Sequence, residues 1–140
     1  MRSCRGRRSN SGSQLPAWAA RGRYFEVRLG RTLHPNFPTI DKFSDGVATS
    51  IKSIDLNAAT YQDATRLAYR VRQYINDVSE FDGATWANYE VNSSEIKRRA
   101  VSLAIPKGSM TTAQREELDS LRLWARMKND KPVDLMITEF

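Results

Sequence analysis

The strongest structural signal in this sequence is one amphipathic stretch, residues 60–79. Its apolar side chains recur every three or four residues, so they fall on one stripe of a helix and leave arginines on another face. β-prone runs precede and follow this stretch, which predicts an α/β fold with a mixed β-sheet flanked by helices. The stripe consists of Ala64, Leu67, Ala68, Val71, Ile75 and Val78.

The segment before this helix is typical of a β-hairpin. A β-prone run at residues 39–43 and another at 47–56 are separated by Ser44-Asp45-Gly46. Asp-Gly between two such runs is a strong short-range hairpin signal, because both residues tolerate the backbone conformation of a tight turn.

The other elements are predicted from the same kinds of pattern. A first helix has Trp18, Phe25 and Leu29 at near-helical spacing and ends at Gly30, and a third helix begins at a capping box of Thr111 and Gln114. The predicted order is α, β, β, α, β, β, α, β. The later strands are placed at Trp86–Val91, Ala100–Ile105 and Val133–Ile137, and the third helix is expected to turn Leu118, Leu121, Trp124 and Ala125 inward.

Length and composition predict one domain. A chain of 140 residues can bury one core, and residues 1–15, rich in Arg, Ser and Gly, predict a flexible leader before a single domain at 16–140. No apolar run reaches the roughly 20 residues of a membrane helix, so no stable membrane insertion is expected. Cys4 is the only cysteine, which excludes an internal disulfide and a thiolate zinc cluster.

The net charge of +6 is concentrated at the start of the chain. Up to Arg31 there are eight arginines and one acid, whereas the rest carries fourteen basic and fifteen acidic residues. The pooled charge is therefore weak evidence for a polyanionic substrate. Four local candidates for phosphate contacts are Arg66, Arg70, Lys97 and Arg98, and the alternative for each is a solvated charged face.

Candidate catalytic residues come from the hairpin and the first helix. A hairpin brings Asp41 near Lys52, and Ser50 and Lys52 share one face of their strand. Hydrolysis of a phosphodiester commonly uses a divalent cation held by carboxylates, together with a lysine that orients water or stabilises charge. Glu26, in the helix before the hairpin, is the only acid before Asp41. Spacing alone favours ordinary surface charges at all of these positions.

His34 is the only histidine of the sequence, so cleavage by a pair of histidines is excluded. Its neighbour Pro35 favours a solvated turn. Trp18, Trp86 and Trp124 have the capacity to stack on bases, but each stands among apolar residues, which favours packing in the core.

Two stretches of the sequence resemble the C-terminal toxin domains of contact-dependent growth inhibition (CdiA) proteins. These are residues 36–43, Asn-Phe-Pro-Thr-Ile-Asp-Lys-Phe, and residues 46–56, which contain Ser50-Ile51-Lys52. The resemblance implies a restriction-endonuclease-like PD-(D/E)XK nuclease. It also implies that Glu26 and Asp41 bind the metal and that Lys52 is the catalytic lysine. Ser50 departs from the general motif, which has Asp or Glu at that position, and leaves one fewer carboxylate for the cation.

The same resemblance predicts the biology of the domain. It implies a divalent cation, magnesium or zinc, and a cognate immunity protein that binds near the active cleft. It further implies secretion as the C-terminal part of a larger cell-surface protein that acts in the cytoplasm of a target bacterium. Similarity within the 46–56 segment favours tRNA as the substrate; DNA cleavage on the same scaffold and a non-catalytic nucleic-acid-binding module are the alternatives.

Overall fold

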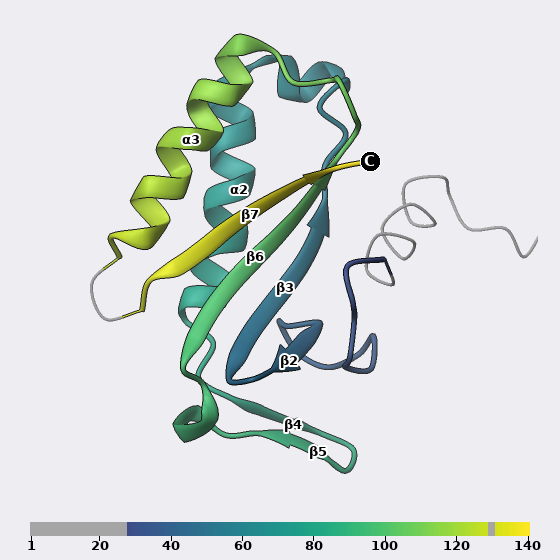
Figure 1. Cartoon of the computed structure of the whole chain (residues 1–140), viewed down its shortest axis with the longest axis vertical. Helices are drawn as coiled ribbons and strands as arrows, with labels where there is room; N and C mark the ends of the chain where they lie inside the picture. The colour runs from purple at the N-terminus through teal and green to yellow at the C-terminus, as the bar shows by residue number, and fades with distance from the viewer. Residues whose placement is uncertain (1–27, 129–130) are drawn as a thin grey trace, which may run out of the picture.

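The computed structural model describes residues 28–128 and 131–140, and this part of the chain alternates strands and helices (Figure 1). None of the described helices is long and apolar enough to cross a membrane. The strands are β2 Lys42–Ser44, β3 Val47–Ser53, β4 Ala84–Trp86, β5 Tyr89–Val91, β6 Arg98–Ile105 and β7 Val133–Glu139; the α-helices are α2 Ala64–Ser79 and α3 Thr112–Arg126, with short 3-10 helices at Ala59–Gln62 and Ser93–Glu95.

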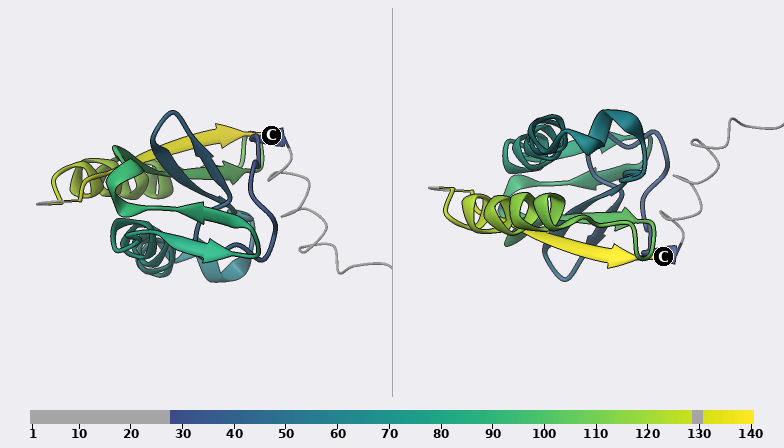
Figure 2. Two further views of the ribbon diagram at one scale, coloured as in Figure 1. Left: turned by 90° about the horizontal axis from the view of Figure 1, so that it is seen from below. Right: turned by 90° about the horizontal axis from the view of Figure 1, so that it is seen from above.

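The main sheet has four strands in the order β2-β3-β6-β7. The β2–β3 pair is antiparallel, whereas β3–β6 and β6–β7 are parallel, so the sheet is mixed as predicted. Each parallel pair needs a crossover, which α2 and α3 provide. The two helices lie side by side (Figure 2). A separate β4–β5 hairpin extends beyond the end of the sheet where β6 begins (Figure 1).

The β2–β3 turn confirms the Asp-Gly prediction. Ser44 lies opposite Val47, which leaves Asp45 and Gly46 as a two-residue loop. Both have positive φ, 53° and 79°. This is the signature of a type I′ turn, whose twist matches that of the strands it joins.

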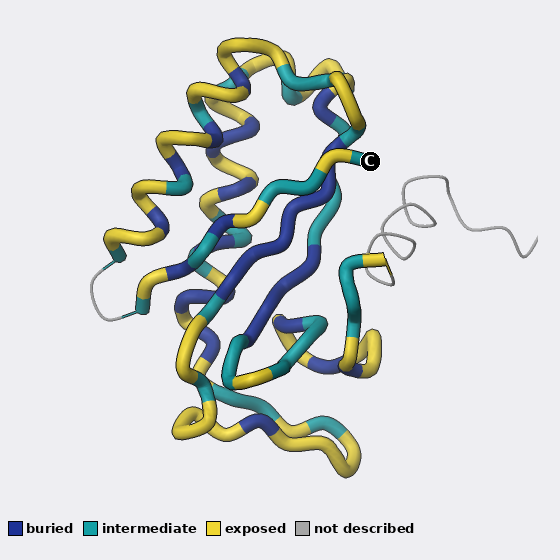
Figure 3. Tube along the Cα trace, viewed as in Figure 1, coloured by how far each residue is buried: buried dark blue, intermediate teal, exposed yellow. Residues whose placement is uncertain are grey.

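The main core lies between the sheet and the two helices. Val101, Leu103 and Ile105 of β6 face this core, together with Val133 and Leu135 of β7. The predicted stripe of α2 is buried there from Leu67 to Val78, while Ala64 is only half-buried. Burial is concentrated along the central strands β3 and β6, and the β4–β5 hairpin is largely exposed (Figure 3).

The helix starts follow capping chemistry. The carboxylate of Asp63 accepts a hydrogen bond from the Thr65 backbone N–H, so α2 begins at Ala64, and residues 59–62 form a separate 3-10 turn where the sequence predicted helix. The predicted capping box of Thr111 and Gln114 is confirmed at the start of α3.

Two predictions about aromatic residues need correction. Trp86 and Tyr89 were expected in one strand, but they face each other across a hairpin whose turn contains Ala87 with φ of 54°. Trp124 was expected in the core, but it is 37% exposed and its ring contacts Lys128, whose Nζ lies 4.7 Å from the ring centroid.

Part of the predicted N-terminal organisation lies outside the described residues. This applies to the leader at 1–15, to Trp18 and to most of the first predicted helix. The described end of that helix agrees with the prediction, because Arg28 is helical and Gly30 has φ of 91°.

Replacement of Gln114 tests how α3 is joined to the segment between β3 and α2. Its buried amide nitrogen donates to the carbonyls of Leu56 and Tyr61, at 3.1 and 2.8 Å, while its oxygen accepts from the Thr111 N–H. Gln114→Ala removes the cap and the side-chain donor to the Tyr61 carbonyl, while the Leu56 carbonyl keeps its hydrogen bond from Gln62 Nε2. The free energy of unfolding should therefore fall by about 2–4 kcal/mol in urea denaturation. The exposed control Glu116→Ala should change it by less than about 0.5 kcal/mol.

Candidate active site

Ser50 and Lys52 lie on the helix-facing side of β3. Ser50 pairs with Val101 and Lys52 with Leu103, and both partners belong to the core under the helices. Paired residues of neighbouring strands share a face. The prediction that Ser50 and Lys52 share a face is therefore confirmed.

The two side chains line one cavity of about 380 Å³. The cavity lies between β3, the loop before β2 and the C-terminal end of α2. This juxtaposition follows from the crossover, because α2 runs antiparallel to β3 and returns beside the first half of that strand. The lining residues are Thr39, Ser50, Lys52, Asp77, Glu80, Phe81, Asp82 and Gly83.

The ammonium group of Lys52 is placed by an aromatic ring of α2. Its Nζ lies 5.3 Å from the centroid of the Tyr74 ring, a favourable cation–π distance. Burial raises the pKa of Tyr74, so the phenol remains neutral at physiological pH. Among the described residues that line this cavity, Lys52 is the only cation.

Three carboxylates line the same cavity, and their environments differ. Asp82 accepts from Lys131 at 2.8 Å and from Arg99 at 3.1 Å. The hydrogen bond from Lys131 lowers the pKa of Asp82, and the charges of Lys131 and Arg99 lower it further. Within the described part of the chain, neither Asp77 nor Glu80 has a side-chain hydrogen bond or ion pair. Sequence analysis missed both, because they lie on α2, far along the chain from the hairpin.

Asp41 lies just before β2, and its carboxylate is engaged by its neighbours. One oxygen accepts from Arg31 at 2.6 Å and the other from the Ile51 backbone N–H at 2.7 Å. The side chains of Arg31 and Asp41 are 13% and 14% exposed. Asp41 was expected near Lys52. The pairing of Lys42 with Thr49 places Asp41 level with Ser50, two residues before Lys52, and Asp41 is not among the described residues that line the cavity.

The loop before Asp41 has a strained backbone. Thr39 has φ of 68°, and the Ile40 N–H donates to the Pro38 carbonyl at 2.7 Å across it, which forms a γ-turn. A β-branched residue with positive φ is an outlier that the surroundings must hold in place. The turn buries Ile40 completely and directs Thr39 to the cavity.

The chemistry of the cavity suits a hard divalent cation. The potential ligands among its described lining residues are carboxylate and hydroxyl oxygens, and no His or Cys is found in this part of the lining. Ser50 is 1% exposed, and its hydroxyl has no hydrogen bond to another described residue. Among residues 28–128 and 131–140, no group of three or more His, Cys, Asp or Glu is arranged to hold a metal. Glu26, the predicted ligand from the first helix, lies outside the described residues.

The four predicted phosphate contacts form two separate groups. Arg66 and Arg70 line a cavity of about 400 Å³ on the first half of α2, together with Tyr61 and Tyr69. Lys97 and Arg98 line another of about 390 Å³ at the start of β6.

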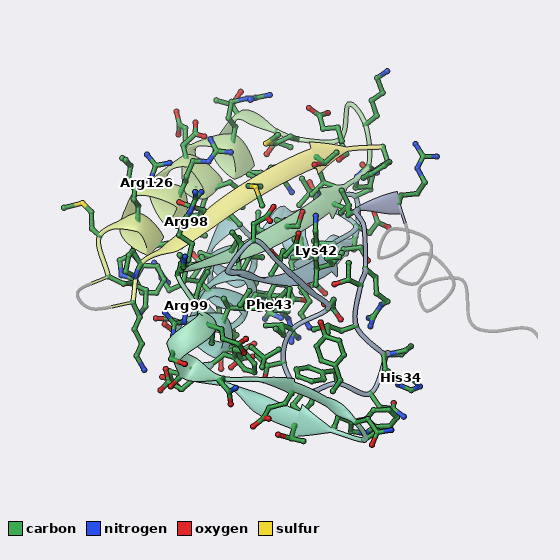
Figure 4. All side chains as sticks on the ribbon, turned by 60° about the horizontal axis from the view of Figure 1, so that its bottom comes forward. His34, Lys42, Phe43, Arg98, Arg99 and Arg126 are labelled. Atoms are coloured by element: carbon green, nitrogen blue, oxygen red, sulfur yellow. The ribbon has the colours of Figure 1, made fainter. Side chains whose placement is uncertain are left out.

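Two further arginines, Arg99 and Arg126, lie beside Arg98. Figure 4 shows Arg98, Arg99 and Arg126 on one side of the molecule, and we call these three residues the arginine patch. Arg98 and Arg126 share one carboxylate, that of Asp134, at 3.2 and 3.9 Å. Two cations on one anion leave this surface positive.

His34 has a packing role. Its ring stacks on Trp86 with centroids 4.1 Å apart, and its Nδ1 accepts from the Asn36 backbone N–H. The predicted turn around His34 is confirmed, since the Phe37 N–H donates to the His34 carbonyl.

Comparison with known proteins identifies the class of this fold. The family described as CDI toxin restriction endonuclease-like domain matches residues 21–138. The α/β core, with a mixed four-stranded sheet and two helices, is thus a restriction-endonuclease-like fold, as predicted. The chain belongs to this family of contact-dependent growth inhibition toxin domains.

Two proteins from Yersinia pseudotuberculosis are similar to this chain, one in sequence and one in structure. "Deoxyribonuclease CdiA" of serotype O:3 (strain YPIII) is 32% identical over 94 residues, which are 65% of this chain and 9% of that protein. A solved structure, "CdiA-CT/CdiI toxin and immunity complex", is 25% identical with a TM-score of 0.63 and covers 90% of this chain and 99% of the matched chain. The preference for tRNA drawn from the sequence finds no support here; the deoxyribonuclease name favours the DNA alternative.

The different environments of Asp41 and Lys52 predict different effects on stability. Asp41→Ala removes the carboxylate that pairs with Arg31 in a nearly buried position. The free energy of unfolding should therefore fall by about 3 kcal/mol. Lys52→Ala removes one half-buried cation–π contact and should cost about 1 kcal/mol or less. Urea denaturation of both variants checks this; an equal loss in the two would contradict the structural role of Asp41.

Proposed function

We propose that this domain is a metal-dependent DNA endonuclease, the toxic part of a contact-dependent growth inhibition protein. The observation that carries the proposal is the cavity in which Ser50 and Lys52 of β3 meet carboxylates of α2. One cation and three anions line it, so phosphate is repelled unless a divalent cation enters as well. The membership of the family supports nuclease chemistry.

The proposed catalytic residues are Glu26, Asp41, Ser50 and Lys52. Lys52 is positioned over Tyr74, where its ammonium donates to a phosphate oxygen or orients the attacking water. The carboxylate of Asp41 accepts hydrogen bonds from the Ile51 N–H and from Arg31. These bonds fix the position of β3 beside Ser50. Glu26 and Asp41 are the predicted carboxylate ligands of the cation.

A divalent cation bound here would neutralise the phosphate and lower the pKa of a bound water. The oxygen donors of the cavity favour magnesium over zinc, because zinc prefers nitrogen and sulfur ligands as well as carboxylates. The hydroxyl of Ser50 adds a neutral oxygen to the potential ligands of the cation.

DNA is proposed as the substrate in preference to tRNA. A relative of 32% identity bears the name deoxyribonuclease. Arg98 and Arg126 of the arginine patch, together with Lys97, offer positive charge to a phosphate backbone, and contacts of this kind form without regard to base sequence. A domain that kills by cutting DNA has no need to read a particular base.

An immunity protein and a larger carrier are also proposed. The related Yersinia toxin was solved in complex with its immunity protein, which supports a cognate inhibitor for this chain. The chain spans only 9% of the CdiA relative, which supports delivery as part of a much larger cell-surface protein into a target cell.

The test of this function is cleavage of supercoiled plasmid and total tRNA by the purified chain, with magnesium, zinc or chelator. Nicking of plasmid only with cation is expected, with a loss of more than a hundredfold in Lys52→Ala, since one general acid–base group typically contributes about 10²–10⁴-fold. Cleavage of tRNA alone would replace DNA as the substrate. Binding to DNA that chelator does not change, without cleavage by any cation, would favour the non-catalytic binding module.

The arginine patch is tested by the salt dependence of DNA binding in the Lys52→Ala background. Each lost phosphate contact should reduce the slope of log K against log salt by about 0.9. Arg98→Ala with Arg126→Ala should therefore reduce the slope by up to about twice that value. The control is Arg115→Ala, an exposed arginine in the first turns of α3. An equal slope in the patch variant and the control would exclude the patch from the interface.

A further inference from the structure

We infer that the cavity on the first half of α2 binds an unpaired nucleotide of the nucleic-acid strand that enters the cavity of Lys52. The inference rests on the proposed nuclease function for the role of that strand as a substrate, but binding of the nucleotide is measurable without any cleavage. We call this cavity, of about 400 Å³, the tyrosine–arginine pocket. The side chains that define it are Tyr61, Arg66, Tyr69 and Arg70.

The pocket combines the two kinds of group that a nucleotide requires. Its described lining contains two arginines and no acid, so it attracts a phosphate. The two tyrosine rings offer π faces, and a nucleobase of any identity stacks on such a face. An acidic peptide would use the cations but has no need of the rings. The combination therefore favours a nucleotide.

The ring of Tyr69 is exposed and has no packing role among the described residues. It is 63% exposed and belongs to neither hydrophobic cluster of the described chain. Tyr61 is different, because it is half-buried and packs against the main core. One wall of the pocket is therefore fixed by the core, and the other is an exposed aromatic ring, which is typical of an interaction site.

The two arginines are held by weak interactions. Arg66 pairs with Asp63 at 3.7 Å, and since both side chains are more than half exposed, this pair contributes little to stability. Arg70 donates to Gln73 Oε1 at a long 3.4 Å. The side-chain hydrogen bond between Arg70 and Tyr61 raises the pKa of Arg70, so the guanidinium stays charged. Each guanidinium has five N–H donors, so both arginines keep donors for a phosphate.

One face of α2 connects the pocket with the cavity of Lys52. Arg70, Tyr74 and Asp77 are four and three residues apart, so they lie on one side of the helix. Arg70 lines the pocket and Asp77 lines the cavity, about 10 Å apart along the helix axis. Tyr74, between them, contacts Lys52. Burial raises the pKa of Tyr74 and the charge of Arg70 opposes this rise, which places Arg70 near the same ring. One strand therefore reaches both sites.

The arrangement requires the strand to be unpaired at the pocket. A base in a duplex is stacked between its neighbours, so the ring of Tyr69 reaches the face of a base only where the strand has left the stack. The volume of about 400 Å³ lies within the usual range of pockets that enclose a small ligand. The ligand is therefore a single nucleotide in an unpaired segment.

Fluorescence anisotropy with labelled oligonucleotides tests the pocket. The full chain is used with chelator, so that metal-dependent cleavage does not interfere. The wild type should bind single-stranded oligothymidylate more tightly than an abasic strand of equal length. Tyr69→Ala should lower the affinity for oligothymidylate roughly five- to 150-fold, because one base–aromatic stack is lost. Its affinity for the abasic strand and for a duplex should not change. Since Tyr69 is exposed, the variant keeps the fold.

Three further variants make the assignment specific. Tyr69→Phe keeps the π face and should bind like the wild type. Arg70→Ala should reduce the slope of log K against log salt by about 0.7, the value for one phosphate of a single strand. The matched control is Tyr89→Ala, which removes a tyrosine, 46% exposed, from the β4–β5 hairpin and should leave binding unchanged.

Four outcomes would overturn the inference. These are equal wild-type affinity for oligothymidylate and the abasic strand, an equal loss in Tyr69→Ala and Tyr89→Ala, and an equal loss for duplex and oligothymidylate in Tyr69→Ala. The fourth is weaker binding of polyglutamate, but not of oligothymidylate, by Tyr69→Ala, which would assign the pocket to an acidic peptide.

Plasmid nicking with magnesium is measured separately, so that the two proposals fail independently. If the binding results are as expected but the wild type does not nick DNA, the pocket stands and the proposed function fails. If the wild type nicks DNA and Tyr69→Ala binds oligothymidylate like the wild type, the function stands and the pocket fails.

Discussion

The parallel pairing of β3 with β6 is the constraint on which the rest of the structure depends. Parallel neighbours cannot be joined by a tight turn, so the chain must cross over between them, and α2 is that crossover. The helix therefore runs antiparallel to β3, and its carboxyl end returns beside Ser50. The cavity of the candidate site is a direct consequence of this return.

The cavity of the candidate site is acidic, whereas the arginine patch on the surface is positive. The net positive charge of the chain lies mainly in its first residues, and the described surface adds the arginine patch. The cavity itself is acidic, and Lys52 is the only cation among the described residues of its lining. In the proposed function, the positive surface holds the polyanion and the acidic cavity holds the cation, so the two are complementary parts of one phosphodiester-cleaving site.

Local patterns predicted a large share of the fold. The Asp45-Gly46 turn, the stripe of α2 and the capping box of Thr111 follow from interactions within a few residues, and all three are present. The exposure of Trp124 was not predicted, because an apolar spacing does not reveal where the helix meets water and cations. The sequence also left undecided which arginine pairs with Asp41, because several arginines lie near it along the chain.

The sequence by itself determined the family and the order of most strands and helices. It also determined the common face of Ser50 and Lys52, because side chains alternate between the two faces from one residue of a strand to the next. Only the tertiary structure decided which acids meet that face. Asp77 and Glu80 reach the cavity because a helix crossover brings them back to β3 from far along the chain. No local spacing encodes that approach; it depends on the pairing of strands that the crossover connects.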